Sequence, residues 1–226
     1  MKVTLITHTP NPDNIVATAA KLCYSSKTLT ELYEKNKEAD NEKFLNKLMD
    51  KSHFSPLEHV SFTFGIEGVS RAFLAQITRH RIASYSVKSQ RYVNESDMKV
   101  VIPSSIWDKP EKLKTYCEVL KTSEHAYKTL IELGVEKEDA RMVLPNACTT
   151  QMMVTMNARS LMNFFKLRCC NRAQWEIREV ADEMLKQCKA AAPLLFAKAG
   201  ASCMYGNCTE GEMCCGNPRK VEEYAE

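Results

Sequence analysis

The most informative stretch of the chain runs from Gln76 to Tyr92 and reads QITRHRIASYSVKSQRY. No Asp or Glu interrupts the sequence between Glu67 and Glu95. Guanidinium groups without carboxylates nearby in the sequence need an anion from elsewhere, and their planar fork of donors fits phosphate oxygens. Serine and tyrosine hydroxyls between the cations add further donors and acceptors. The stretch predicts a site for a phosphate-bearing ligand, with four cations: Arg79, Arg81, Lys88 and Arg91.

The composition indicates an ordinary globular protein. Of the 226 residues, 44% are hydrophobic and 26% charged, which suits one domain with a real core. A net charge of +3 is too small to indicate nucleic-acid binding by itself. The N-terminus lacks the apolar region of a signal peptide, and no apolar run approaches the roughly 18 residues that a membrane helix needs. We therefore expect a cytoplasmic protein with no membrane partner.

Hydrophobic periodicity predicts a mixed domain, α/β or α+β. Alternation of apolar and polar residues predicts strands over 3–9 and 60–66, and a composition rich in Thr, Val and Met indicates a strand over 149–156. Helical patterns cover 13–22, 29–49 (one helix or a pair), 111–133, 136–143, 159–167 and 173–192. Ser70 is expected to cap a helix that runs through Ile77 into the cluster at 79–81, and Gly134 to end the long helix.

The spacing of the cationic stretch resembles a known signature. After Arg79-His80-Arg81 come seven residues, then Ser89, one residue and Arg91. Flavin-dependent thymidylate synthases carry Arg-His-Arg, seven residues and Ser. Three further segments resemble that family in the same order: HFSPLEH at 53–59, ARMVLP at 140–145, and NARSLMNFFKLR at 157–168 followed by AQWEIR at 173–178.

The resemblance implies a fold and an activity. The fold would be a single domain with a mostly antiparallel sheet flanked by helices, here a catalytic domain over 1–200 with a Cys-rich tail at 201–226. The enzyme would convert dUMP to dTMP, with methylenetetrahydrofolate as the carbon donor and NADPH-reduced FAD as the reductant. Its partners would be these small molecules and its own copies, in a homotetramer whose active sites are shared between subunits, and no nucleic acid.

Family positions carried onto this sequence imply two overlapping ligand sets. The FAD set is Ser55, Arg79, His80, Arg81, Ile82, Val87, Asn157, Ala158, Arg159 and Asn163. The dUMP set is Gln76, Ile77, Thr78, Arg79, Val87, Lys88, Ser89, Gln90, Arg91, Arg141 and Arg168. Arg168 is the implied catalytic residue, because a fixed cation against the uracil ring stabilises negative charge that develops there. Many members carry Glu or Gln where this chain has Val87, so one polar contact near the flavin is missing.

Helix geometry adds an argument that does not depend on the family. Arg159 and Asn163 are four residues apart and share a helix face. Arg168 follows Arg159 by nine residues, and at about 100° per residue it points to the opposite side. If the helix reaches Arg168, one chain cannot easily direct all three side chains at one ligand, which favours sites shared between subunits.

Ten cysteines are many for a chain without a secretion signal, and reduced thiols are the default. Cys148 has no neighbouring base to activate it, so we expect a core residue and no cysteine nucleophile. No metal is expected; the alternative left open is a thiolate zinc site formed by Cys169, Cys203, Cys208 and Cys214. Two other functions also stay open: binding of a nucleic-acid backbone by residues 79–91, and a zinc protein with a vestigial nucleotide pocket.

Overall fold

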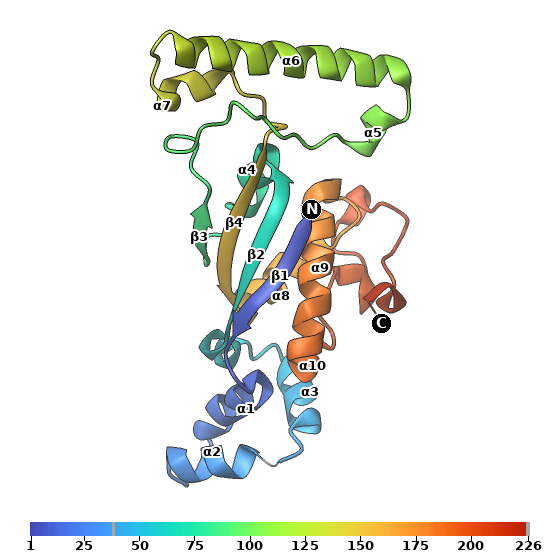
Figure 1. Cartoon of the computed structure of the whole chain (residues 1–226). Coiled ribbons are helices and arrows are strands. Elements are labelled where there is room, and N and C mark those ends of the chain that lie inside the picture. Colours follow the sequence, from blue (N-terminus) through green and yellow to red (C-terminus); the bar gives the residue numbers. More distant parts are fainter. Residues whose placement is uncertain (38, 225–226) are drawn as a thin grey trace. The chain divides into compact units, whose positions relative to one another are not determined.

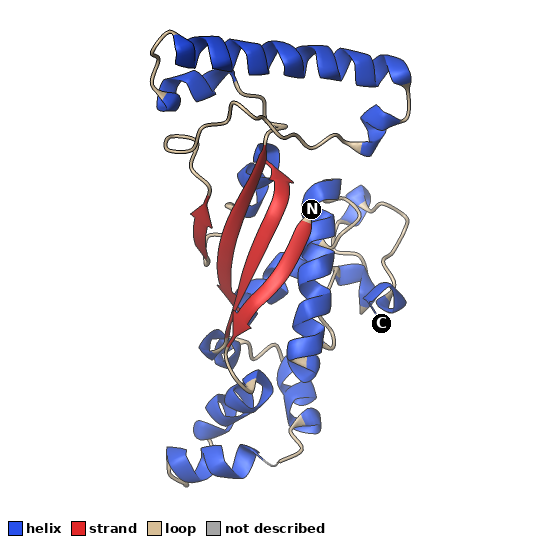
Figure 2. Cartoon of the chain, in the orientation of Figure 1, coloured by secondary structure: helices blue, strands red, loops and turns tan. Residues whose placement is uncertain are grey.

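The computed structural model describes residues 1–37 and 39–224. Its sheet has four antiparallel strands in the order β1-β2-β4-β3 (Figures 1 and 2). The strands are β1 (Lys2–His8), β2 (Ser61–Ser70), β3 (Ser84–Val87) and β4 (Thr149–Asn157). The α-helices are α1 (Pro12–Leu22), α2 (Leu29–Lys37), α3 (Glu42–Asp50), α4 (Arg71–Ile77), α5 (Ser104–Trp107), α6 (Pro110–Glu132), α7 (Lys137–Ala140), α8 (Ala158–Arg168), α9 (Trp175–Ala191) and α10 (Pro193–Phe196). The 3₁₀ turns are η1 (Ser55–His59), η2 (Arg141–Val143), η3 (Ser202–Met204), η4 (Gly211–Met213) and η5 (Val221–Tyr224).

The predicted fold class is confirmed: helices accompany a four-stranded antiparallel sheet. The pattern over 29–49 is a helix pair, α2 and α3, with residue 38 outside the described residues. Strand β3 was not predicted. It has four residues at the end of the strand order, alternately exposed and half-buried, so no buried apolar face marks it in the sequence.

The chain forms two compact units. Unit 1 comprises residues 1–2, 66–79 and 86–152. Unit 2 comprises residues 3–65, 80–85 and 153–226. Strands β2 and β4 contribute residues to both.

The core of unit 2 is aromatic. Alternate residues of β2 are buried, as the two-residue period of a strand requires, and Phe62 is among them. The rings of Phe62 and Phe196 meet edge to face at 5.3 Å, and those of Phe165 and Phe196 at 5.9 Å. Helix α9 buries residues spaced at three and four, and Gln174 caps it by accepting hydrogen bonds from two backbone N–H groups in its first turn. This packing holds α8, which carries the C-terminal motif.

In unit 1, the helix α4 begins as predicted and ends earlier than predicted. The Ser70 hydroxyl accepts from the N–H of Phe73 at 3.2 Å and caps the helix. The Thr78 hydroxyl donates to the carbonyl of Leu74 at 2.7 Å, at the point where α4 stops. The prediction that this helix continues into residues 79–81 is wrong, because the N–H of Arg79 donates to the carbonyl of Gln76 at 3.4 Å, which closes a turn and not a further step of the α-helix.

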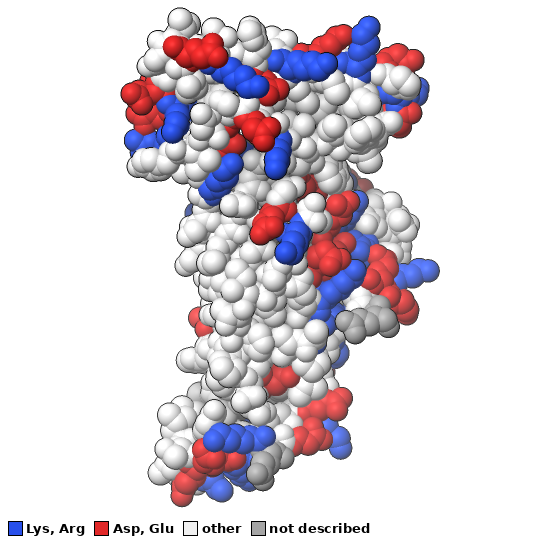
Figure 3. Space-filling view, in the orientation of Figure 1, with Lys and Arg blue, Asp and Glu red and all other residues white. Residues whose placement is uncertain are grey.

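The long helix of unit 1, α6, ends as predicted. Gly134 follows it with a φ of +83°, a conformation that glycine adopts without steric cost. Basic and acidic side chains mingle over α6 and α7, so no single-sign patch covers the face shown in Figure 3. Within the described residues, no helix is long and apolar enough to cross a membrane.

Candidate functional site

Unit 1 presents the second half of the cationic stretch on a turn. Beyond β3, the N–H of Lys88 donates to the carbonyl of Gln151 at 3.0 Å, which continues the pairing with β4. The chain then turns, with the N–H of Arg91 donating to the Ser89 hydroxyl at 3.2 Å. The N–H of Val93 donates to the Ser89 carbonyl at 3.1 Å. Sheet pairing and this turn fix the backbone that carries the cations.

Two of the four cations have carboxylate partners, contrary to the sequence argument. Lys88 Nζ lies 3.0 Å from a carboxylate oxygen of Glu95. Arg91 Nε lies 2.5 Å from Glu138, whose backbone carbonyl also accepts from Arg141 Nε at 2.9 Å. Glu138 is 47 residues from Arg91 in sequence, so a search for neighbouring acids could not find it. We call Lys88, Arg91, Glu138 and Arg141, together with Arg71, the anion cluster.

Arg71 is a member of this cluster that the sequence argument missed. Its Nη1 donates to the carbonyl of Lys88 at 3.4 Å, and its side chain is half-buried. Burial lowers the pKa of Arg71, and repulsion by Arg141 adds to this effect, while Glu95 opposes it. A sequence signal existed: Arg71 is the first residue of α4, where the helix dipole disfavours a cation.

Gln90, in the same turn, has an unsatisfied hydrogen-bond donor. Its Nε2 atom is buried and has no hydrogen-bond partner in the described part of the chain. Leaving a buried donor unsatisfied costs about 1–3 kcal/mol. A ligand that offers an acceptor oxygen to Gln90 would remove that cost.

In unit 2, the side chains of Arg168 and His80 are joined by a hydrogen bond. Arg168 is the last residue of α8, and its Nε donates to His80 Nε2 at 3.0 Å. The His80 ring packs edge to face on Phe164, with ring centroids 4.9 Å apart. Burial, and secondarily the charge of Arg168, lower the pKa of His80 to about 4. His80 is therefore neutral at pH 7, and it accepts the Arg168 hydrogen bond without neutralising that charge.

Helix α8 also carries the flavin candidates of unit 2. It begins at its cap Asn157, whose side chain accepts from the N–H of Ser160 at 2.8 Å. It runs without a break to Arg168, as the geometric argument required. Arg159 forms an ion pair at 2.5 Å with Glu58 of η1, a partner that the sequence argument did not include. Because Arg159 pairs with η1 and Arg168 with His80, the two arginines engage different neighbours.

The remaining predicted contacts divide between the units. Unit 1 holds Gln76, Ile77, Thr78, Arg79, Val87, Lys88, Ser89, Gln90, Arg91 and Arg141. Unit 2 holds Ser55, His80, Arg81, Ile82, Asn157, Ala158, Arg159, Asn163 and Arg168. Ile77 and Ala158 are buried, so they offer a ligand little side-chain surface. Arg79 and Arg81 are exposed and form no salt bridge with a described residue, and the Ile82 side chain is 73% exposed.

Cys148 is a core residue, as predicted. It is 2% exposed. Burial raises its pKa to about 11, and the carboxylate of Glu95 contributes in the same direction. The thiol is therefore protonated near neutral pH, when only the thiolate is a good nucleophile.

Within the described residues, the cysteines of the alternative zinc site are not brought together as a group of metal ligands. Cys169 is fully buried, and burial followed by the charge of Asp182 raises its pKa well above the ordinary value. Cys170, the next residue, lines a pocket with cysteines of the tail. Among residues 1–37 and 39–224, no group of three or more His, Cys, Asp or Glu side chains is arranged to hold a metal ion.

Comparison with known proteins decides the family. Residues 4–194 match the family model described as thymidylate synthase complementing protein. The chain belongs to this family. Members similar to it include proteins from Geobacter sulfurreducens, 50% identical over 98% of this chain and 97% of the relative, and from Clostridium tetani, 48% identical over 99% and 96%. A relative from Pyrococcus furiosus is 42% identical over 94% and 91%. All three are named flavin-dependent thymidylate synthase, so the resemblance drawn from the four motifs is confirmed.

Proposed function

We propose that this protein is a flavin-dependent thymidylate synthase, which converts dUMP to dTMP with methylenetetrahydrofolate as the carbon donor and NADPH-reduced FAD as the reductant. Relatives that carry this name match the chain along nearly all of its length. The structural observation that carries the proposal is the hydrogen bond between Arg168 and a neutral His80.

Arg168 is the proposed catalytic residue. Transfer of a carbon to the uracil ring needs electron density in the ring, and a fixed cation against the ring stabilises the negative charge that develops. Neutral His80 accepts the hydrogen bond from Arg168 Nε and so orients the guanidinium. Position and charge together make Arg168 suited to activate the pyrimidine.

The anion cluster and Gln90 form the proposed contacts of unit 1 with dUMP. The Arg91–Glu138 pair is half-exposed on both sides, and such pairs contribute only about 0–1 kcal/mol. A nucleotide phosphate could therefore displace Glu138 from Arg91 at little cost. Gln90 would gain the acceptor that its buried amide lacks. The residues present fit a nucleotide monophosphate.

The donors of the flavin set fit FAD. Arg79 and Arg81 are exposed cations without a salt bridge to the described chain, as binding of a pyrophosphate requires. Ile82 is an exposed apolar side chain beside them in sequence, suited to contact a ring. Bound FAD would supply the redox chemistry, which the side chains cannot. We propose that Arg79, Arg81 and Ile82 hold it, with Ser55, Asn157, Arg159 and Asn163 as further contacts.

No cysteine nucleophile is proposed for this reaction. Cys148 interacts electrostatically with Arg71 and Lys88 of the anion cluster, and burial raises its pKa to about 11, which keeps the thiol protonated. Ser89 has its hydroxyl engaged by the N–H of Arg91, and its proposed role is binding of substrate.

The proposal includes a homotetramer whose active sites are shared between subunits. Its support is the nine-residue separation of Arg159 and Arg168 along an unbroken α8. Sedimentation velocity combined with activity assays would test it, and a monomer with full turnover would contradict it. Residues 1–200 as catalytic region, 201–226 as a separate tail, and a cytoplasmic location remain predictions.

A turnover assay separates this function from the alternatives. We expect the purified protein to be yellow, with flavin absorbance near ~450 nm. It should oxidise NADPH and form dTMP only when both dUMP and methylenetetrahydrofolate are present. Flavin bleaching without dTMP would indicate a flavoprotein of another function. Binding that depends steeply on salt and ignores mononucleotides would instead indicate a nucleic-acid-binding module.

A further inference from the structure

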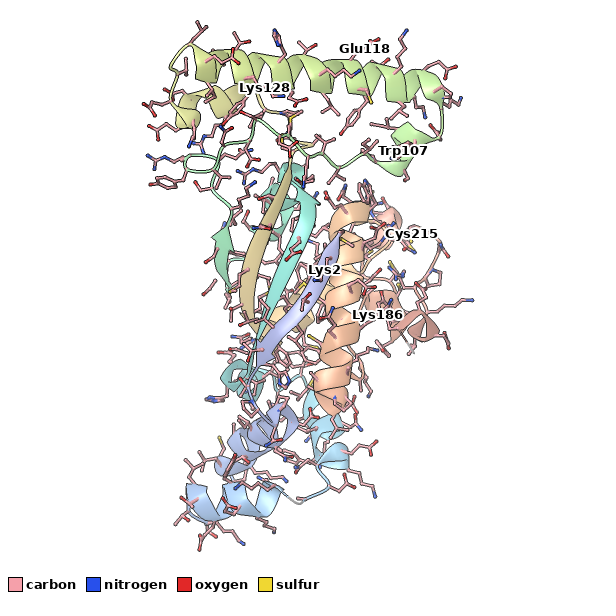
Figure 4. The ribbon with its side chains drawn as sticks, viewed as in Figure 1. Lys2, Trp107, Glu118, Lys128, Lys186 and Cys215 are labelled. Carbon is pink, nitrogen blue, oxygen red and sulfur yellow. The ribbon has the colours of Figure 1, made fainter. Side chains whose placement is uncertain are left out.

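A cysteine-lined pocket lies in unit 2, and none of its lining residues belongs to the proposed FAD or dUMP sets. The tail folds over the loop that follows α8, and Figure 4 labels Cys215 there. All ten cysteines of the chain are free thiols. Five of them line this one pocket: Cys170, Cys203, Cys208, Cys214 and Cys215.

Within the pocket, Cys208 and Cys214 form a pair. Their thiols are hydrogen-bonded to each other. Each sulfur also accepts a hydrogen bond from the backbone N–H two residues later, Cys208 from Glu210 and Cys214 from Gly216, the second at 3.5 Å. Both sulfurs therefore sit in turns whose amide dipoles stabilise negative charge on sulfur.

The two thiols are not equivalent. The N–H of Gly216, and then the Cys208 thiol, lower the pKa of Cys214. For Cys208 the N–H of Glu210 acts in the same direction, but the neighbouring Cys214 and Cys203 outweigh it and raise its pKa. Cys214 is also exposed. An exposed thiol that accepts a backbone hydrogen bond and lies beside a second, less exposed thiol is the arrangement of a nucleophilic cysteine and its resolving partner.

The tail is held in place at both ends of this pair. Arg172 Nη1 donates to the carbonyl of Met213 at 2.6 Å, next to Cys214. Arg219, which is 9% exposed, donates to Asp182 at 3.0 Å and to the carbonyl of Cys169 at 2.9 Å. The N–H of Arg219 donates to the Cys203 sulfur at 3.4 Å. These contacts tie the segment that carries the thiol pair to the loop after α8 and to α9.

We propose that Cys214 and Cys208 form a redox-active dithiol that reacts with hydroperoxides. The Cys214 thiolate attacks the peroxide oxygen, the O–O bond breaks, and with one proton the products are a sulfenic acid on Cys214 and water (an alcohol from an organic peroxide). The Cys208 thiol then attacks the sulfenic sulfur, the S–O bond breaks, and the disulfide forms with release of a second water. Each cycle oxidises two thiols by two electrons and reduces one peroxide. This inference does not depend on the thymidylate synthase function.

The test uses the full chain, reduced and freed of reductant, then exposed to one equivalent of hydrogen peroxide. Remaining thiols are alkylated and the peptides are analysed by mass spectrometry. Cys214 should lose its reactivity towards the alkylating agent about tenfold faster than Cys23, an exposed cysteine outside the pocket, because oxidation follows thiolate character. The oxidised peptides should contain a Cys208–Cys214 disulfide.

Two variants complete the experiment. In C208S, dimedone should trap a sulfenic acid on Cys214, since no resolving thiol remains. In C215S, which removes a neighbouring pocket cysteine, the Cys208–Cys214 disulfide should form as in the wild type. Oxidation of Cys214 no faster than Cys23, a disulfide to Cys203 or Cys215, or stoichiometric zinc that shields these thiols would each overturn the proposal.

Discussion

Arg91 and Arg168, proposed to hold the same nucleotide, have contrasting surroundings. Arg91 in unit 1 is half-exposed, and its charge is balanced by the carboxylate of Glu138. Arg168 in unit 2 is half-buried and donates to His80, which burial keeps neutral. A cation paired with an exposed carboxylate can exchange one anion for another, while a cation oriented by a hydrogen bond is held in one position. The contrast suggests that the anion cluster sets affinity for dUMP and that Arg168 sets the rate.

The largest effect is expected when Arg168 is removed. In Arg168→Ala, kcat for dTMP should fall about 100- to 1,000-fold, the usual loss when one preorganised electrostatic group is deleted. The flavin should remain bound, and the flavin absorbance of the purified variant measures this. Lys166→Ala, an exposed cation in the same last turn of α8, is the matched control and should keep wild-type turnover. More than a tenth of wild-type kcat in Arg168→Ala would contradict the proposed role.

A smaller effect, on binding, is expected in unit 1. In Arg141→Ala or Arg91→Ala, the Kd for dUMP should rise about 10- to 100-fold, which corresponds to the loss of a charge-assisted hydrogen bond. Calorimetric titration with deoxyuridine, which lacks the phosphate, provides the internal control, because the variants and the wild type should bind it equally. Lys121→Ala, on the exposed face of α6, should leave the dUMP affinity unchanged. Equal losses for dUMP and deoxyuridine would show that these arginines do not hold the phosphate.

The neutral state of His80 predicts how stability depends on pH. Its folded pKa of about 4 lies below the 6.5 of the free side chain, so between these values the unfolded chain binds more protons. The contribution of His80 to the free energy of unfolding should therefore decline as pH falls from 6.5 to about 4 and be constant above 6.5. Chemical denaturation across this range measures it, and His80→Gln should flatten the profile. An unchanged profile in His80→Gln would show that His80 titrates normally in the folded protein.

The smallest effect concerns the carboxylate that competes with phosphate. Glu138→Gln removes the charge that balances Arg91 and keeps the backbone carbonyl that accepts from Arg141. We expect dUMP to bind about two- to fivefold more tightly, in line with the small value of an exposed ion pair. The gain should shrink in high salt, because screening weakens the pair in the wild type. Weaker binding of dUMP by the variant would mean that Glu138 supports the nucleotide site.

Local patterns predicted most of the fold. Alternation located β2, and a composition rich in Thr, Val and Met indicated β4. Ser70 marked the start of one helix and Gly134 the end of another, and Cys148 was identified as core. Strand β3 was not predicted, because this edge strand of Ser, Tyr and Val has no buried face and therefore no alternation of apolar and polar residues. The helix α4 was predicted too long because it stops at Ile77, where the sequence has no glycine or proline to mark an end.

The site was predictable only in part. Spacing identified the cationic stretch and the α8 motif, and the match to the family model spans both. The partners that set their electrostatics lie far away in sequence: Glu138 is 47 residues from Arg91, Glu58 is 101 from Arg159, and His80 is 88 from Arg168. Such contacts follow from tertiary packing, which no local pattern encodes.

Single-turnover formation of dTMP at saturating dUMP tests the central contrast most directly. Enzyme with reduced flavin and methylenetetrahydrofolate is mixed with increasing dUMP, and the maximal rate is compared among the wild type, Arg141→Ala and Arg168→Ala. We predict that Arg141→Ala reaches the wild-type rate once dUMP saturates it, while Arg168→Ala stays about 100-fold or more below at any concentration. If instead high dUMP restores the wild-type rate in Arg168→Ala and not in Arg141→Ala, the division of roles between the two units is wrong.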